Sequence, residues 1–392
     1  MTAGLAPLWI TLAIQAMVSM ALLALPAMAP SVAAATGISA AYIGLYIALA
    51  YAGAVAASLA SGTAVARWGA IRVSQAGLLV AAAGLVLCAL PSAAAIAAGA
   101  LLVGMGYGPI TPASSHLLAR TTPPHRMALV FSVKQTGVPL GGALAGAIVP
   151  GLQLAAGWQA ALLAVAAACL LCGAVAQGLR AAFDADREPS RPLGLGNFLD
   201  PVRLVLTEPA LRMLAGCSFL FSIAQLSLTT YLVTFLTDSL AYGLLAAGAM
   251  LSVSQVGAVL GRVLWGWVAD RWVGARRMLA LLAGAMAACA LLSAMLRPGV
   301  PAPAVAVLLF LFGACAIGWN GVYLAEVARQ APPGKAGLAT GGTLSITFLG
   351  VVLGPPAFGA VSALFGTYRA GFGLLAVPLA GCAIVLWRRP RG

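Results

Sequence analysis

Charged side chains are scarce in this chain of 392 residues. Lys, Arg, Asp and Glu together make up 7% of the sequence, whereas soluble globular proteins are roughly a quarter charged. Hydrophobic residues make up 62%. So few charges could not cover a water-facing surface, and the apolar surface must therefore face lipid. The composition excludes a soluble globular protein and predicts a polytopic membrane protein.

Acids and histidines are few, with 8 Asp and Glu and 2 His. His116 and His125 have no nearby Cys or acid with which to form a zinc site. Gly334-Lys335 is not followed by Ser or Thr, so it does not form a nucleotide-binding P-loop. We therefore expect a protein that is not an enzyme, has no cofactor or metal, and is driven by gradients.

Basic residues outnumber acids by 21 to 8, which gives a formal net charge of +13. They occur singly or in pairs between apolar runs rather than on one basic face, so the excess does not indicate nucleic-acid binding. This distribution is typical of the cytoplasmic loops of membrane proteins.

Apolar runs of about 20 residues, the length needed to cross a membrane, follow one another along the chain. They predict twelve spans, at roughly 8–29, 39–61, 73–91, 93–119, 127–150, 157–179, 210–237, 242–268, 276–296, 302–326, 336–361 and 366–388. The runs lack the alternation of barrel strands, so we expect helices. Ala27-Met28-Ala29 resembles a signal-peptidase site, but no positive charge precedes the long run from Pro7. We expect that run to remain as the first helix.

The basic residues are distributed unevenly over the loops between these spans. Seventeen lie on one side, namely Arg67, Arg72, Arg120, Arg126, Arg180, Arg187, Arg191, Arg203, Arg212, Arg271, Arg276, Arg277, Arg329, Lys335, Arg388, Arg389 and Arg391. Only Arg297 and Arg369 lie on the other side. Because basic residues collect in cytoplasmic loops, we expect an inner-membrane protein with both termini in the cytoplasm.

The longest polar stretch, residues 181–209, holds five of the eight acids and divides the chain into equal halves. We expect an N-terminal six-helix bundle at 1–180, a cytoplasmic linker at 181–209 and a C-terminal six-helix bundle at 210–392. A linker of this polarity would lie in water between the two bundles.

Two loop sequences recur in the two halves. Residues 119–126 return as 328–335, and residues 62–69 return as 266–272. Repeats with equal, even numbers of spans run parallel in the membrane. The predicted fold is therefore all-α, with twelve transmembrane helices in two parallel-repeat six-helix bundles.

The loop after the eighth span resembles the motif Gly-x-x-x-Asp-Arg-x-Gly-x-Arg-Arg of the major facilitator superfamily. With one extra residue before Gly274, the matching residues are Gly266, Asp270, Arg271, Gly274, Arg276 and Arg277. In the loop after the second span, Ala66 replaces the Asp, and the residues that fit are Gly62, Arg67, Gly69 and Arg72. The resemblance implies the major facilitator fold and rocker-switch alternating access. It also implies that the loop Asp braces the outward-facing state, and it leaves open whether Ala66 abolishes the first brace.

The fifth span partly resembles the antiporter motif of the same superfamily, through Gly137-Val138-Pro139 followed by Gly141-Gly142. The Gly-x-x-x-Gly spacing at 137–141 and 142–146 would also allow two helices to pack closely. We favour this packing interpretation.

Two cations lie deep in the predicted spans, Lys134 in the fifth and Arg262 in the eighth. Each is about 12 Å from the cytoplasmic end of its helix. An ionised group at that depth costs roughly 2.5–3.5 kcal/mol, which favours a functional role. The alternatives are that Lys134 extends to the interface and that Arg262 pairs with Glu326. Further candidates for substrate binding are Gln15, Gln225, Gln255, Asn320 and Tyr323.

No predicted span has a carboxylate near its middle. This argues against a cationic substrate and favours a small organic anion, which we expect to be a carboxylate. Arg262 resembles the substrate-binding Arg of the monocarboxylate and oxalate:formate carriers. In the superfamily the fifth and eighth spans are neighbours, which implies that Lys134 and Arg262 bind one anion. The monocarboxylate carriers have a proton-coupling Asp where this chain has Ala258, so symport, exchange and uniport stay open.

The alternatives to an anion carrier are a drug or metabolite exporter and a transport-inactive membrane receptor. We expect a monomer in the lipid bilayer. Its partners would be the anion and either a coupling proton or a counter-anion.

Overall fold

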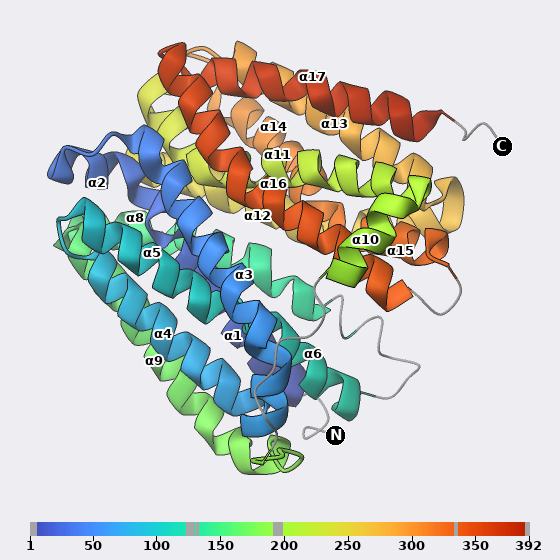
Figure 1. Ribbon diagram of the computed structural model, residues 1–392. Coiled ribbons are helices and arrows are strands. Elements are labelled where there is room, and N and C mark those ends of the chain that lie inside the picture. Colours follow the sequence, from blue (N-terminus) through green and yellow to red (C-terminus); the bar gives the residue numbers. More distant parts are fainter. Residues whose placement is uncertain (1–5, 123–129, 131–132, 191–198, 333–335, 389–392) are drawn as a thin grey trace. The chain divides into compact units, whose positions relative to one another are not determined.

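A computed structural model describes residues 6–122, 130, 133–190, 199–332 and 336–388 of the chain. Within these ranges every regular element is a helix (Figure 1). Twelve helical stretches are long and apolar enough to cross a membrane, which confirms the predicted number of spans. The predicted loop residues His125, Arg126, Arg191, Lys335, Arg389 and Arg391 lie outside the described residues.

The chain folds into two compact units. The N-terminal unit comprises Met1–Ala40 and Leu45–Gly196, and the C-terminal unit comprises Ala41–Gly44 and Asn197–Gly392. In Figure 1 the first unit runs from blue to green and the second from yellow-green to red.

Helices rich in Ala and Leu, both strong helix formers, build the N-terminal unit. They are α1 (Ala6–Ala24), η1 (Pro26–Met28), α2 (Ala29–Thr36), α3 (Ile43–Trp68) from Leu45 on, α4 (Ala70–Cys88), α5 (Ala93–Tyr107), α6 (Ile110–Thr121), α8 (Gly137–Ala156) and α9 (Trp158–Phe183). The short helix η2 (Ala40–Tyr42) lies where the chain passes into residues 41–44 of the C-terminal unit. Helix α1 packs against α8 and α9, and α4 packs against α5 and α9. Gly69 alone separates α3 from α4, with a φ of +94° that suits glycine.

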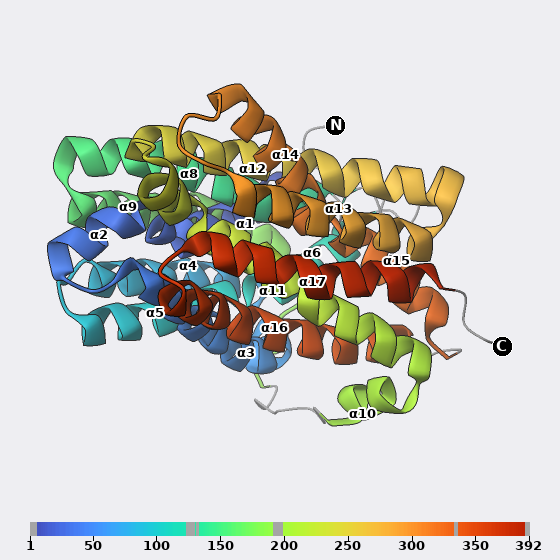
Figure 2. The ribbon, with the colours of Figure 1, turned by 90° about the horizontal axis from the view of Figure 1, so that it is seen from above.

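The C-terminal unit contains α10 (Leu199–Thr207), α11 (Pro209–Leu240), α12 (Leu244–Val268), the π-helix η4 (Ala269–Val273), α13 (Ala275–Met295), α14 (Ala302–Gly318), α15 (Asn320–Gln330), α16 (Ala336–Leu364) and α17 (Tyr368–Trp387). Helix α12 packs against α14, and α11 packs against α16. Helices α13 and α17 lie side by side (Figure 2).

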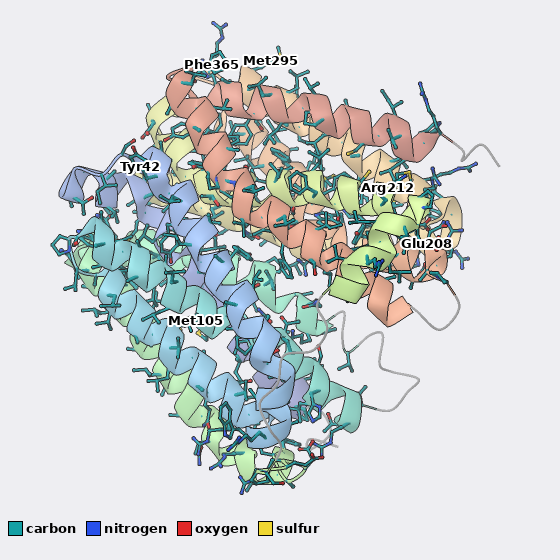
Figure 3. The ribbon with its side chains drawn as sticks, viewed as in Figure 1. Tyr42, Met105, Glu208, Arg212, Met295 and Phe365 are labelled. Atoms are coloured by element: carbon teal, nitrogen blue, oxygen red, sulfur yellow. The ribbon has the colours of Figure 1, made fainter. Side chains whose placement is uncertain are left out.

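The predicted linker contains a helix of its own. Helix α10 packs against α16, where Gly342 leaves no room for a Cβ beside the backbone of Pro201. At the corner between α10 and α11, the Arg212 side chain donates a hydrogen bond of 3.3 Å to the carbonyl of Leu206 (Figure 3). This part of the polar stretch therefore belongs to the C-terminal unit.

The two units use the same close contact between helices. A Cβ on Gly53 of α3 would meet the carbonyl of Leu101 in α5, and a Cβ on Gly257 of α12 would meet the carbonyl of Phe310 in α14. Leu101 and Phe310 are 209 residues apart, and the two glycines are 204 apart. Small residues allow such close approach of membrane helices. The sequence repeat thus corresponds to a repeated packing contact.

Two spans are interrupted at corresponding positions. The fourth changes from α5 to α6 at Gly108-Pro109, where proline has no N–H to donate, and the tenth changes from α14 to α15 at Trp319. The hydroxyl of Ser58 donates a hydrogen bond of 2.9 Å to the carbonyl of Gly108. The interruption of the tenth span lies next to Asn320, one of the predicted substrate-binding candidates.

Candidate functional site

A buried polar cluster in the N-terminal unit contains Lys134. Its ammonium donates to Gln15 Oε1 on α1 at 3.2 Å and to Thr111 Oγ1 on α6 at 3.5 Å. Thr111 also donates to Gln15 Oε1 at 3.2 Å. Lys134 is 1% exposed and Gln15 is 0% exposed, so the ammonium lies within the unit. This geometry does not favour the alternative in which Lys134 extends to the interface.

The side-chain amide of Gln15 has one buried donor, Nε2, that is not hydrogen-bonded within the described part of the chain. A buried donor of this kind is costly unless a water molecule or a ligand accepts from it. The cluster therefore offers both an ammonium and an amide N–H.

Close helix packing holds this cluster together. A Cβ on Gly137 would lie 2.9 Å from Cβ of Gln15, and a Cβ on Gly141 would meet the carbonyl of Ala16. The two glycines let α8 approach α1 closely, which brings the residues just before α8 up to Gln15. The observation supports the packing interpretation of the glycines in the fifth span.

A second polar cluster lies in the C-terminal unit around Gln225 of α11. Its Oε1 accepts hydrogen bonds from Trp319 Nε1 at 3.1 Å and from Asn320 Nδ2 at 3.5 Å. Tyr323 is buried on the next turn of α15, and its hydroxyl lies near Thr343 of α16. These polar groups are uncharged.

Arg262 lies on α12 of the C-terminal unit and is half-buried, with its Nε atom buried. A Cβ on Gly318 would lie 3.2 Å from the backbone nitrogen of Arg262, so Arg262 lies beside the interruption between α14 and α15. Gln255 is buried two turns earlier on α12. The proposed alternative partner, Glu326, accepts hydrogen bonds from Arg329 at 2.8 and 2.9 Å and from Gln330 at 2.9 Å.

The structure thus brings Gln15 to Lys134, and Gln225 to Asn320. Thr111 and Trp319 complete the two clusters and were not identified from the sequence. Thr111 precedes Asn320 by 209 residues, the offset that also separates the repeated loops, so the repeat contained a signal for it. Trp319 has no such signal.

The loop-motif regions of the two units differ in the contacts of their carboxylates and arginines. Asp270 and Arg271 are exposed in η4, whereas Arg276 donates to the carbonyls of Leu386 and Arg388 at 3.0 and 2.9 Å. The described part of the chain shows no side-chain partner for Asp270. The remaining motif residues lie in α3 (Gly62, Arg67), between α3 and α4 (Gly69), in α4 (Arg72), in α12 (Gly266) and in α13 (Arg277).

In the N-terminal unit a carboxylate from the predicted linker occupies the start of α4. Asp184 accepts hydrogen bonds from the backbone N–H groups of Ile71 at 2.8 Å and Arg72 at 3.0 Å. The Asp184 side chain lies so close to Gly69 that a Cβ there would overlap it. Asp184 is 2% exposed. An anion is favourable at a helix N-terminus, so this unit has a braced carboxylate although residue 66 is Ala.

Asp186 makes a second contact with the same end of the unit. Its carboxylate lies 2.7 Å from His116 Nε2 and 2.5 Å from Arg120 Nη1, both on α6. Partial burial opposes ionisation, but the hydrogen bond with His116 and the charge of Arg120 lower the pKa of Asp186 below its ordinary value. Asp184 and Asp186 together tie the linker to α4 and α6.

The fold defines an integral membrane protein built from two related six-helix units. Residues 8–347 match the family model of the Major Facilitator Superfamily, and the chain belongs to that superfamily.

Similar proteins include transporters from Mycobacterium tuberculosis and Corynebacterium glutamicum. An uncharacterized MFS-type transporter of Mycobacterium tuberculosis is 30% identical over 285 residues, which are 71% of this chain and 62% of that protein. The gentisate transporter of Corynebacterium glutamicum is 27% identical over 282 residues, which are 69% of this chain and 61% of that protein. The match therefore spans about three fifths of the length of these curated relatives.

Among solved structures, the peptide transporter POT in complex with sulfate superposes with a TM-score of 0.77. The superposition covers 98% of this chain and 93% of that one, at 18% sequence identity. At this identity the likeness concerns the fold alone.

Proposed function

We propose that the protein is a secondary transporter that moves a small organic anion, a carboxylate, by rocker-switch alternating access. The observation that carries the proposal is the ammonium of Lys134, which is 1% exposed and hydrogen-bonded to two uncharged side chains. A buried cation is costly in a membrane-spanning unit, and a bound anion offsets that cost.

Arg262 is the proposed second cation of the anion site, contributed by the C-terminal unit. A guanidinium can hold a carboxylate through two parallel hydrogen bonds, whereas an ammonium acts as a point charge. The spare amide donor of Gln15 suits an oxygen of the same ligand. The name of the gentisate transporter denotes a carboxylate substrate, which supports the same class of ligand. The resemblance of Arg262 to the substrate Arg of the monocarboxylate and oxalate:formate carriers also favours it.

The orientation in the membrane is part of the proposal. The loop arginines favour an inner-membrane protein with both termini and the linker in the cytoplasm. The coupling partner is a proton or a counter-anion. Ala258, which replaces the acid of the proton-coupled carriers, favours anion exchange or uniport over proton symport.

The test is a screen of purified protein against mono- and dicarboxylates by thermal shift, followed by affinity measurements on variants. Arg262→Lys should lose most of the affinity for the best anion, because the two-pronged geometry is lost while the charge remains. Lys134→Arg should have a milder effect, because a point charge is replaced by another cation. Binding of wild-type strength in both Arg262→Lys and Lys134→Gln would contradict the proposed site.

Counterflow in proteoliposomes separates transport from binding alone. The proposed transporter should exchange the labelled anion for the unlabelled one across the bilayer. A chain that binds the anion but shows no counterflow would be a receptor. A chain that binds no anion would favour the exporter alternative.

A further inference from the structure

A pocket of about 690 Å³ lies wholly in the N-terminal unit, where α3 ends and α4 begins. Its walls come from α3, α4, the fourth span, the end of α9 and the first residues of the linker. The volume falls within the range of pockets that hold small molecules, about 300–1,000 Å³. None of the residues discussed above as candidates for anion transport from the membrane interior lines this pocket.

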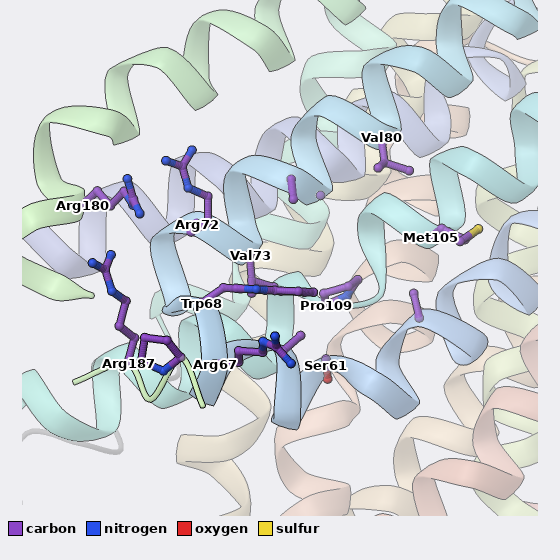
Figure 4. A pocket seen from close by; sticks show the side chains of 15 residues that line it. Ser61, Arg67, Trp68, Arg72, Val73, Val80, Met105, Pro109, Arg180 and Arg187 are labelled. Atoms are coloured by element: carbon purple, nitrogen blue, oxygen red, sulfur yellow. The ribbon is translucent and has the colours of Figure 1, made fainter. Parts of the chain in front are cut away.

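Four arginines line the pocket, namely Arg67, Arg72, Arg180 and Arg187. In Figure 4, Arg72, Arg180 and Arg187 lie on one side of the view and Arg67 lies below Trp68. Among the described residues that line the pocket none is acidic. Three acids of the linker lie nearby and do not line the pocket: Asp184 accepts from the amides of α4 with Arg180 Nε 3.9 Å away, Asp186 pairs with Arg120 and His116, and Glu188 follows Arg187. The lining itself carries four guanidinium groups.

One end of the pocket is apolar. Val80 of α4 and Met105 of α5 lie on the side of the view away from Arg72, Arg180 and Arg187 (Figure 4). Trp68, Val73 and Pro109 also line the pocket. Trp68 is 47% exposed and Met105 is 44% exposed. Aromatic side chains of this exposure are typical of membrane–water interfaces. The pocket therefore changes from charged to apolar along its length.

Hydrogen bonds hold the linker wall of the pocket against the N-terminal unit. The backbone N–H of Glu188 donates to the carbonyl of Ala66 at 2.7 Å. Four residues earlier, Asp184 accepts from the backbone N–H groups of Ile71 and Arg72 in α4. These bonds hold Arg187 and Pro189 beside α3 and α4. The four arginines thus come from α3, α4, α9 and the linker.

We propose that this pocket binds an anionic phospholipid, with the phosphate among the four arginines and an acyl chain along Val80 and Met105. Arginine is well suited to phosphate because its planar donors can hold two oxygens at once. The apolar end and the exposed indole favour a lipid over a soluble phosphate, which would leave them without a partner. The proposal does not depend on the identity of the transported anion.

The test measures lipid retention by the full chain with native mass spectrometry. Protein purified in detergent is offered phosphatidylglycerol or phosphatidylcholine with identical acyl chains. Each basic residue near a lipid surface contributes about 1 kcal/mol, which is about fivefold in affinity. The Arg180→Gln/Arg187→Gln double variant should therefore bind phosphatidylglycerol roughly 25-fold more weakly, close to the level of phosphatidylcholine.

Two further variants separate the possible ligands. Ala76→Trp fills the apolar part of the pocket from the exposed side of α4 and should weaken phosphatidylglycerol binding without removing a charge. Arg203→Gln removes an exposed arginine on α10 of the other unit and should leave lipid binding unchanged. Thermal-shift measurements with inorganic phosphate and glycerol phosphate test whether the pocket binds a soluble phosphate.

Preferential binding of phosphatidylglycerol that is lost in the double variant and weakened in Ala76→Trp is the expected result. Equal binding of the two lipids by wild type would overturn the proposal. So would a double variant that keeps its preference. Binding of soluble phosphate that Ala76→Trp leaves intact, without any lipid preference, would show that the pocket takes a free anion instead.

Discussion

The cluster around Gln15 and the cluster around Gln225 occupy corresponding places in the two units, but only the first contains a charge. Thr111 and Asn320 are 209 residues apart, and each is bonded to the glutamine of its own unit. Lys134 is also 209 residues before its counterpart, the buried Thr343. The hydrogen-bonding framework is therefore repeated while the ammonium is not.

For Arg262, the second cation, the charge lies in the C-terminal unit and the uncharged counterpart lies in the N-terminal unit. Arg262 lies 204 residues after Ser58, the same offset as between the contact glycines Gly53 and Gly257. Ser58 uses its hydroxyl for the carbonyl of Gly108 at the interruption of the fourth span, whereas Arg262 lies beside the interruption of the tenth. The glycines that pack the helices repeat between the units, whereas Lys134 and Arg262 have uncharged counterparts. These two charges are therefore not requirements of the fold.

The comparison assumes that the two units cross the membrane in the same direction, and thiol labelling tests this with an all-or-none outcome. Single cysteines at Pro298 and at Pro189, both exposed, are treated with an impermeant reagent from outside. Only Pro298→Cys should react, and the parent chain provides the background from the seven native cysteines. Labelling at both positions, or at Pro189 alone, would refute the twelve-span topology.

Removing the ammonium should make the N-terminal cluster resemble its neutral counterpart. Lys134→Gln should weaken carboxylate binding by about 10- to 100-fold, since hydrogen bonds to charged groups contribute about 1.5–3 kcal/mol. A dicarboxylate should lose more affinity than a monocarboxylate. Isothermal titration checks both ligands.

The matched control for that variant is Thr343→Gln at the equivalent position of α16. It alters the neutral cluster without changing any charge and should have a much smaller effect. Equal losses in the two variants would mean that the charge difference between the clusters is irrelevant to binding.

The two loop acids should separate stability from transport. Asp184→Asn should lower the free energy of unfolding by about 1 kcal/mol, because the buried carboxylate caps two amides of α4. Asp270→Asn should leave thermal stability unchanged, because its side chain is exposed. The superfamily resemblance predicts that Asp270→Asn lowers transport more than Ala66→Asp does. Melting temperatures and proteoliposome uptake measure the two properties, and a stability loss only in Asp270→Asn would reverse the comparison.

The smallest expected effect concerns the pH dependence of the N-terminal unit. The pKa of Asp186 is lowered in the folded chain, so its contribution to stability is present above the pKa of an unfolded Asp and is lost as pH falls through the folded pKa. Asp186→Asn should therefore lower the melting temperature slightly at neutral pH and not at strongly acidic pH. Persistence of the difference at acidic pH would point to a packing defect instead.

Hydropathy and repeats were sufficient to predict the span count and the all-helical fold, because each span is a long apolar run. Gln15 and Lys134 could be singled out because polar groups are conspicuous in such runs. Their contact with Thr111 could not be predicted, since it depends on where the fourth span is interrupted and on how α8 rotates against α1.

The linker was the least predictable part of the sequence. Its acids indicated a solvated segment, yet Asp184 is buried against α4 and residues 199–207 form α10. Sequence distance hides both contacts, because Asp184 lies 113 residues from Ile71. The carboxylate that the loop motif lacks at Ala66 is supplied from a segment that no motif includes.

The interruption of the fourth span has a mechanical consequence. A continuous helix transmits a tilt along its whole length as a stiff rod, whereas a helix broken at a proline acts as a joint. Thr111 lies just beyond the joint at Pro109, on a short segment whose far end is held by Asp186 through His116 and Arg120. Helix α6 therefore connects the linker to the hydroxyl beside Gln15, separately from the close contact between α5 and α3.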